Sequence, residues 1–141
     1  MPIEITRARA LIIHQKCVLL MKRIKPDMVY YTLLGGKVEP GETPEQACVR
    51  EVMEECGVTV KLGREIHRAF DVFNDIPNTH IIYLCHYQNG TPTLGGEEQL
   101  RSTAENYYEP LWVPIDQLSD LVIKPEWQAP FILSAIKEHG Q

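Results

Sequence analysis

A single well-delimited helix constrains the fold of this chain more than any other feature of its sequence. Thr43 is a good N-cap, Pro44 fits the first helical position, and Gln46 completes a T-x-x-Q capping box. Gly57 is the residue type that most often follows a helix, because it adopts a left-handed conformation without strain. The sequence therefore predicts a central helix over residues 44–56.

This predicted helix has two chemically different faces. Its apolar positions recur with helical spacing and are Val49, Val52, Met53 and Cys56. Its acidic positions are Glu51, Glu54 and Glu55. At about 100° per residue, the two sets point in roughly opposite directions. We therefore expect one side of the helix to pack on a sheet and the acidic side to face an open cleft.

The acidic face indicates a cation site. Glu51 lies three residues before Glu54 and four before Glu55, and residues at these spacings share a face. Such like-charge pairs cost on the order of a few tenths of a kcal/mol each, and a bound cation offsets that cost. Sites rich in carboxylates and free of sulfur suit Mg²⁺ or Mn²⁺, which usually bridge to phosphate oxygens. The pattern favours metal-assisted chemistry on a phosphate compound, with a solvated acidic surface as the alternative.

The residues in and around this helix resemble the signature of the Nudix hydrolases, G-x5-E-x7-R-E-U-x-E-E-x-G-U, where U is aliphatic. Every fixed position is filled, by Gly36, Glu42, Arg50, Glu51, Val52, Glu54, Glu55, Gly57 and Val58. The family's usual L-P-G-G approach reads L-L-G-G in this chain, with Leu34 in place of the proline. We expect that departure to change loop rigidity more than chemistry.

The resemblance implies an α/β fold, a Nudix-type α/β/α sandwich with a central mixed β-sheet, in which residues 1–141 form a single domain. Periodicity places a hairpin before the signature, over residues 8–13 and 17–21. The other predicted strands cover residues 28–34, 58–62, 65–73, 79–87 and 111–113, with a break at Gly63. Two further helices are predicted over residues 115–121 and 127–139.

The resemblance also implies roles for individual residues. Glu51, Glu54 and Arg50 are the expected catalytic residues, with Glu51 as a metal ligand or the base and Arg50 mainly orienting the carboxylates. The expected ligands of Mg²⁺ or Mn²⁺ are Glu51, Glu54, Glu55 and the carbonyl of Gly35. Glu42 is expected to be a structural partner of Arg50 or an outer-shell ligand.

Four residues outside the signature are candidate substrate-binding residues, namely Arg23, Lys25, Glu98 and Glu109. Arg23 and Lys25 lie in a basic segment that could reach phosphates. Glu98 lies in the long polar segment 89–106, which we expect to close over the substrate as a lid, with a surface insertion of no function as the alternative. Glu109 resembles a position that is frequently acidic in the family.

The composition of the chain limits the kinds of partner that it is expected to bind. The net charge of −5 argues against a stable nucleic-acid complex. No apolar run approaches the roughly 18 residues that a membrane span needs, and the first residues lack a basic leader, so a cytoplasmic location is expected. The four cysteines show no C-x-x-C pairing and are expected to be reduced thiols. The resemblance is compatible with a homodimer.

The sequence thus predicts a metal-dependent hydrolase that splits the pyrophosphate linkage of a nucleoside diphosphate linked to another group. The small-molecule substrate would be a nucleoside triphosphate, an ADP-sugar or a similar nucleotide. Residues 73–75 carry neither the proline of many ADP-ribose enzymes nor the tyrosine of many dinucleoside polyphosphate enzymes, so the substrate stays open. The alternative is a catalytically silent Nudix-fold domain that senses nucleotides, although such domains usually lose the signature carboxylates.

Overall fold

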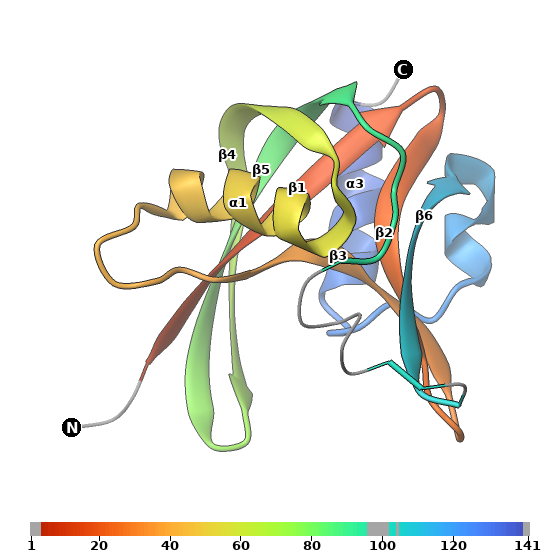
Figure 1. Cartoon of the computed structure of the whole chain (residues 1–141), viewed down its shortest axis with the longest axis horizontal. Coiled ribbons are helices and arrows are strands. Elements are labelled where there is room, and N and C mark those ends of the chain that lie inside the picture. Colours follow the sequence, from red (N-terminus) through yellow and green to blue (C-terminus); the bar gives the residue numbers. More distant parts are fainter. Residues whose placement is uncertain (1–3, 96–101, 104, 140–141) are drawn as a thin grey trace.

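A mixed sheet with a helix on each face is the framework of the molecule (Figure 1). The computed structural model describes residues 4–95, 102–103 and 105–139. In this part of the chain, six strands are ordered β4-β5-β1-β3-β2-β6. Helix α1 (Pro44–Cys56) packs on one face and α3 (Gln128–His139) on the other. The expected α/β architecture is therefore confirmed.

The strands are longer than the sequence pattern indicated. They are β1 (Ile5–His14), β2 (Cys17–Ile24), β3 (Val29–Lys37), β4 (Thr59–Phe73), β5 (Ile76–Asn89) and β6 (Tyr107–Pro114). The predicted N-terminal hairpin is confirmed, since His14 pairs with Cys17. Gln15 and Lys16 both have positive φ, which is the geometry of a tight two-residue hairpin turn. Strand β1 also runs parallel to β5 and antiparallel to β3, so it lies at the centre of the sheet.

The predicted break at Gly63 is wrong, because β4 is continuous. Its pairing with β5 shifts register between Leu62 and Glu65 and again between Glu65 and His67. Gly63 permits a close approach there, since a Cβ on it would lie 2.2 Å from the Leu84 carbonyl oxygen. The glycine therefore marks a bulge within one strand and not the end of a strand.

The C-terminal helices also differ from their predicted bounds. The predicted helix over residues 115–121 is a short 3-10 helix, η1 (Ile115–Asp120). Helix α3 begins at Gln128, so Trp127 precedes it. No helix in the described part of the chain is both long and apolar enough to cross a membrane.

Helix α1 begins and ends where the capping signals predicted. The Thr43 hydroxyl accepts a hydrogen bond from the Gln46 backbone N–H at 3.1 Å, and the Gln46 side chain accepts one from the Thr43 N–H at 3.0 Å. At the other end, Gly57 has φ of 75° and its N–H donates to the Met53 carbonyl at 2.8 Å. Both ends are thus satisfied by local bonds, which fixes the position of the signature residues between them.

The core face of α1 is rotated from the predicted apolar stripe. Val52 and Cys56 are fully buried as expected, together with Ala47 and Cys48. Met53 is 44% exposed, so its assignment to the core face was wrong. Glu55, which accepts a hydrogen bond from the Gly35 N–H of β3, is buried where the pattern had placed Met53 on the core face, so the approach of β3 sets which side of the helix meets the sheet.

The capping box should contribute measurably to stability. We expect Thr43→Ala to lower the free energy of unfolding by about 1 kcal/mol, because a helix N–H loses its acceptor. Urea unfolding followed by circular dichroism measures the change. The control is Ser119→Ala, at an exposed position in η1, which should stay within about 0.5 kcal/mol of the wild type. Equal midpoints for the two variants would contradict a stabilising role for the cap.

Candidate functional site

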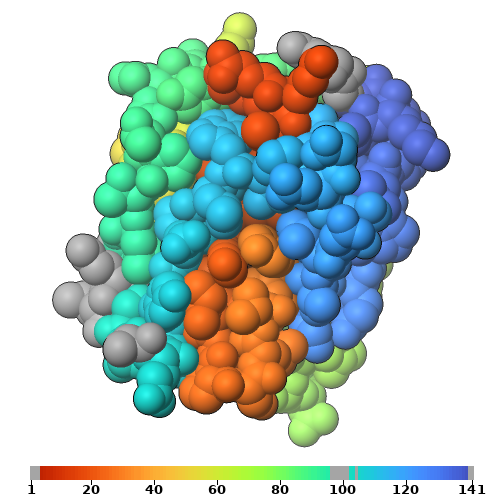
Figure 2. Space-filling view, turned by 90° about the vertical axis from the view of Figure 1, so that its right-hand side faces the viewer, coloured from red at the N-terminus to blue at the C-terminus, as the bar shows by residue number. Residues whose placement is uncertain are grey.

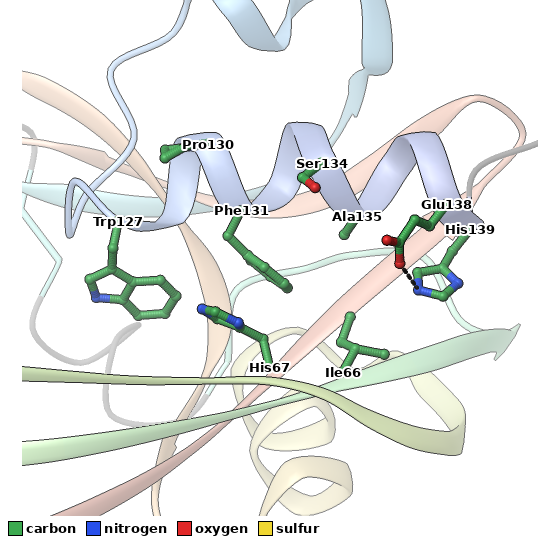
Figure 3. Close-up of a pocket in the computed structure, with 9 residues that line it drawn as sticks. All are labelled: Ile66, His67, Trp127, Pro130, Phe131, Ser134, Ala135, Glu138 and His139. Carbon is green, nitrogen blue, oxygen red and sulfur yellow. Dashed lines mark ion pairs between the residues drawn. The ribbon is translucent and has the colours of Figure 1, made fainter.

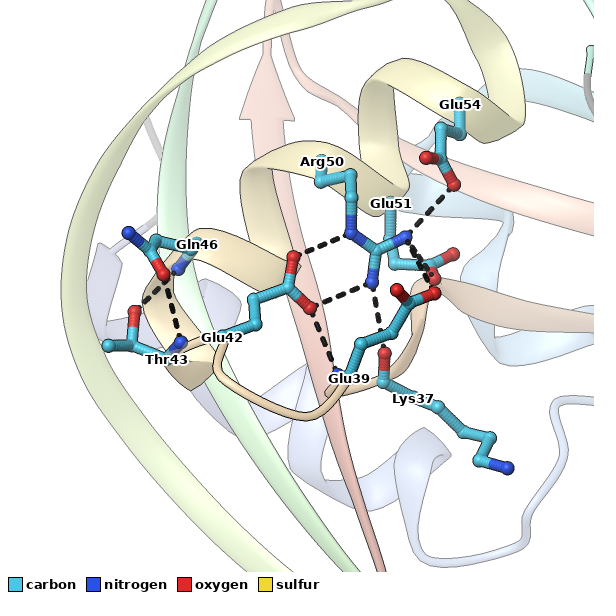
Figure 4. Close-up of polar contacts among 8 residues, drawn as sticks. All are labelled: Lys37, Glu39, Glu42, Thr43, Gln46, Arg50, Glu51 and Glu54. Carbon is cyan, nitrogen blue, oxygen red and sulfur yellow. Dashed lines mark hydrogen bonds and ion pairs between the residues drawn. The ribbon is translucent and has the colours of Figure 1, made fainter.

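Arg50 is the centre of a charged cluster on the outer side of α1 (Figure 4). Its guanidinium binds Glu42 through Nε at 2.6 Å and Nη2 at 2.9 Å. Its Nη1 donates to Glu51 and to Glu54, each at 2.9 Å. Nη2 also donates to the Lys37 carbonyl at 3.1 Å, a contact that the sequence could not reveal because it involves a backbone oxygen. One cation therefore brings together three carboxylates and the end of β3.

The local sequence explains how Arg50 reaches all of these groups. Glu54 is one helical turn further along α1, at the i, i+4 spacing that places two side chains together. Glu42 belongs to the turn before the helix, where its carboxylate also accepts a hydrogen bond from the Glu39 backbone N–H at 3.0 Å. Gly41, with φ of 81°, turns the chain back toward the helix. The capping box and this turn hold Glu42 in place for the guanidinium.

The charges of this cluster stabilise one another. The hydrogen bond with Glu42 is the main cause that raises the pKa of Arg50, with Glu51 adding to it against the opposing effect of burial. The same hydrogen bond, followed by the one from the Glu39 N–H, lowers the pKa of Glu42. Both groups therefore stay charged through the neutral range.

The carboxylate of Glu51 lies against the backbone of β3. A Cβ placed on Gly36 would lie 2.6 Å from Cδ of Glu51 and 2.7 and 2.8 Å from its two carboxylate oxygens. Glycine at this position therefore leaves the space that the carboxylate occupies. This contact explains why the signature has a glycine at this position, in addition to the wider range of backbone conformations that glycine allows.

Glu55 is buried, so its predicted place on an open acidic face is wrong. It is 8% exposed, and its Oε1 accepts a hydrogen bond from the Gly35 N–H at 2.8 Å. Gly35 has φ of 143°, and a Cβ on it would lie 2.1 Å from the Ala8 carbonyl oxygen. The unusual backbone at Gly35 lets β3 offer an N–H to the helix, and this bond draws Glu55 inward.

These groups fit a hard divalent cation by their chemistry. The donors are the carboxylates of Glu51, Glu54 and Glu55, and Gly36 provides a cradle beside one of them. As placed, no three acidic, histidine or cysteine side chains of the described residues converge on one point. Glu51 and Glu54 are instead turned toward Arg50. The Glu54 side chain is 56% exposed, so a cation can reach its carboxylate from the solvent while the ion pair with Arg50 holds it.

Three candidate substrate residues outside the signature lie on a different part of the molecule. Arg23 lies over the Tyr108 ring at 4.2 Å and donates to the carbonyls of Ile24 and Tyr107, so it joins β2 to β6. Lys25 begins the turn after β2, and Glu109 lies in β6 opposite Lys22. The β2–β3 hairpin and β6 form the side of the molecule seen in Figure 2. Among the described residues, no hydrogen bond or ion pair joins these three residues to Arg50.

The long segment after β5 is anchored to α1 at its start. Thr93 N–H donates to the Cys56 carbonyl and Gly95 N–H to the Glu55 carbonyl, both at 3.0 Å. These bonds satisfy carbonyl groups at the end of the helix. Glu98, a predicted substrate residue, lies outside the described residues, and so does Glu97. The lid therefore stays a prediction.

A groove of about 390 Å³ lies between β4 and α3, on the face of the sheet away from α1 (Figure 3). Its wall includes the ring of His67, which stacks on Phe131 with ring centres 4.5 Å apart. The full lining is Ile66, His67, Trp127, Pro130, Phe131, Ser134, Ala135, Glu138 and His139. None of the signature residues belongs to it, so the groove is separate from the Arg50 cluster.

Comparison with known proteins shows the family to which the chain belongs. The sequence profile of the NUDIX domain matches residues 5–134. An NAD-capped RNA hydrolase NudC of Haemophilus influenzae (strain PittGG) is 36% identical over 91 residues, which are 64% of this chain and 33% of that protein. NudC of Salmonella heidelberg (strain SL476) is 46% identical over 90 residues, which are 64% and 34% of the two chains. The chain thus spans about a third of the length of these relatives.

Solved structures share the fold. The MutT protein from Methanosarcina mazei Go1 superimposes with a TM-score of 0.76 at 23% identity, covering 99% of this chain and 98% of that one. A UDP-X diphosphatase gives a TM-score of 0.69 at 17% identity, covering 100% of this chain and 66% of that one. With the profile match over nearly the whole chain, these findings show that the chain belongs to the Nudix hydrolase family.

The Glu42–Arg50 pair should make stability depend on pH. Because the pKa of Glu42 is lowered from 4.5, its contribution is present above pH 4.5 and is lost as the pH falls through the folded-state pKa. We therefore expect Glu42→Gln to lower the melting temperature most near pH 7 and progressively less below pH 4.5. The control is Glu105→Gln, an exposed position, with little effect at any pH. A Glu42→Gln deficit that is constant with pH would contradict the assigned role.

Proposed function

We propose that this chain is a metal-dependent hydrolase that splits the pyrophosphate linkage of a nucleoside diphosphate linked to another group. One observation carries the proposal: Arg50 holds Glu42, Glu51 and Glu54 together, and Glu51 lies in the space left by Gly36. Membership of a hydrolase family supports it. All the carboxylates of the family signature are present in this chain, and a helix with a purely structural role would not need them.

The proposed cofactor is Mg²⁺ or Mn²⁺, held by Glu51, Glu54, Glu55 and the Gly35 carbonyl. When bound, such a cation polarises phosphoryl oxygens and lowers the pKa of bound water. The protein's own part is to orient these groups, because Arg50 fixes two of the carboxylates through directed hydrogen bonds. Either Glu51 or Glu54 then accepts a proton from the water that attacks phosphorus, while the anhydride P–O bond breaks.

The names of the relatives support cleavage of a pyrophosphate linkage. They do not identify the group that is linked to the nucleoside diphosphate. An NAD-capped RNA hydrolase and a UDP-X diphosphatase both act, by name, on compounds that contain a nucleoside diphosphate linked to something else. We propose that the substrate of this chain is a small nucleotide of this kind, because its net charge of −5 disfavours a long nucleic acid. A catalytically silent nucleotide-sensing domain is the alternative, and turnover distinguishes the two.

A substrate panel tests the proposal. NADH, ADP-ribose, UDP-glucose, dGTP and a short NAD-capped RNA are incubated with Mg²⁺ or Mn²⁺, and cleavage products are measured by chromatography. We expect hydrolysis of at least one small nucleotide. We expect Glu54→Gln to lower its rate by at least ~10²-fold, the scale of losing a positioned electrostatic group. Glu138→Gln, on the exposed side of α3, is the matched control and should leave the rate unchanged.

Each outcome of the panel decides one question. Binding of nucleotides without any turnover supports the sensing alternative. Turnover that survives Glu54→Gln removes Glu54 from the reaction. Circular dichroism of the variant checks that it is folded, which is expected because Glu54 is exposed and contributes nothing to the core.

Metal binding should stabilise the fold independently of activity. A ligand that binds only the folded state adds RT ln(1 + [L]/Kd), about 2.7 kcal/mol at a hundredfold excess over Kd. We therefore expect Mg²⁺ or Mn²⁺ to raise the melting temperature of chelator-treated protein, with Na⁺ at equal ionic strength as control. The shift should shrink in Glu54→Gln. Identical melting curves at all metal concentrations would count against the metal site.

A further inference from the structure

Two cysteines face each other in the core between α1 and the sheet. Cys48 belongs to α1 and Cys85 to β5, 37 positions further along the chain, and their Sγ atoms lie 3.7 Å apart. The two residues are 0% and 1% exposed and belong to the same hydrophobic cluster. Both are free thiols. The fold therefore brings together two thiols that no spacing in the sequence marks as a pair.

The other two cysteines have different surroundings. Cys56 is also buried on α1, but its Sγ contacts the Val52 carbonyl of the same helix at 3.4 Å. Cys17 is half-buried and begins β2. Among the hydrogen bonds of the described residues, the one contact between two sulfur atoms is that of Cys48 with Cys85. The tertiary structure thus distinguishes one pair among the four cysteines.

A short movement would bring this pair to bonding distance. The sulfur atoms of a disulfide are about 2.05 Å apart, so the two Sγ atoms would have to approach by roughly 1.6 Å. Helix α1 is already close to the sheet at this point, because Sγ of Cys48 also lies 3.7 Å from the Arg9 carbonyl of β1. Rotation of the two side chains and a small shift of the helix supply the movement.

Cys85 is the more reactive partner. The hydrogen bond from the Cys48 thiol is the main cause that lowers the pKa of Cys85; burial opposes it, and a backbone hydrogen bond from Gly63 adds to it. The same sulfur contact, together with burial, raises the pKa of Cys48. The thiolate is the nucleophilic form of a cysteine. Cys85 therefore reacts first, while Cys48 keeps its proton.

The position of Cys85 next to the edge of the sheet gives a route for a small reagent. Cys85 pairs with Leu62 of β4, which is the outermost strand on this side. The register shifts directly after Leu62, and the next residue, Gly63, is half-buried and has no side chain. A bulge interrupts the hydrogen-bond ladder, and weakly held segments open locally. This is the side from which a small neutral oxidant can reach Cys85.

We propose that Cys48 and Cys85 form an oxidative modification site, at which a hydroperoxide converts the two thiols into an intramolecular disulfide. With hydrogen peroxide, the Cys85 thiolate attacks one oxygen, the O–O bond breaks, and hydroxide leaves with Cys85 as a sulfenic acid. The Cys48 sulfur then attacks the Cys85 sulfur, and the S–O bond breaks. The Cys48 proton goes to the departing hydroxide, which leaves as water. Both sulfurs are oxidised, and both peroxide oxygens are reduced.

The disulfide would join the helix of the signature covalently to the sheet. Cys48 lies two residues before Arg50 on the same helix, so the link would act on the element that carries the candidate site without touching the site itself. The modification is independent of the function proposed above, because it requires neither a substrate nor a metal ion.

Peptide mapping of the oxidised protein tests the proposal. Folded protein is treated with hydrogen peroxide, the remaining thiols are blocked with iodoacetamide, and tryptic peptides are analysed by mass spectrometry without reduction. Cleavage after lysine and arginine places the four cysteines in separate peptides, 17–22, 38–50, 51–61 and 69–101. We expect 38–50 joined to 69–101, with the loss of two hydrogen atoms, as the main product. Dithiothreitol should separate the two peptides, and protein oxidised in urea should give mixed pairings.

Variants test the order of the two steps. In Cys48→Ala, the sulfenic acid of Cys85 has no resolving thiol and should be captured by dimedone, whereas Cys85→Ala should give no dimedone adduct at Cys48. Cys56→Ala is the matched control, because it removes a buried thiol from the same helix, and it should keep the link. Circular dichroism checks that each variant is folded.

The map of the wild type decides the proposal without any variant. If the folded protein yields no joined 38–50 and 69–101 peptides while Cys17 is oxidised, or yields them no more often than protein in urea, the modification site is overturned. A dimedone adduct at Cys48 in Cys85→Ala, with none at Cys85 in Cys48→Ala, would overturn the assignment of Cys85 as the first nucleophile.

Discussion

The guanidinium of Arg50 is the interaction on which the candidate site depends. Three carboxylates on and beside one helix would repel one another, and Arg50 places a single positive charge between them. The bidentate bond to Glu42 fixes the plane of the guanidinium, which then determines where Glu51 and Glu54 point. The capping box matters for the same reason, because it sets where the turn that carries Glu42 enters the helix.

The backbone of β3 completes this arrangement from the other side. Glycine at 36 makes room for the Glu51 carboxylate, and glycine at 35 takes a conformation that directs its N–H to Glu55. A buried carboxylate is expensive unless it is hydrogen-bonded, so this N–H is what allows Glu55 to leave the solvent. The two adjacent glycines therefore serve different carboxylates and are not interchangeable parts of a loop.

Strand β1 separates two kinds of chemistry across the sheet. Successive side chains of a strand point to opposite faces, so Ala8 and Ala10 support the α1 core while Arg7 and Arg9 face the α3 side. Small residues on one face let the helix with the carboxylates approach closely. Arginines on the other face join β1 to β5, through Asn78 and His80.

The sequence by itself determined the helix over residues 44–56, its two caps, the N-terminal hairpin and the carboxylates that surround Arg50, because these depend on local spacing and local hydrogen bonds. The tertiary structure decided that Glu55 is buried and Met53 exposed, since the approach of β3 and not the helical period sets which side of α1 meets the sheet. It also kept β4 continuous through Gly63, and it joined Arg9 to Leu33 and Asp71 to Trp127, which lie far apart in the chain. Contacts between distant segments fix these features, and no pattern within a single segment encodes them.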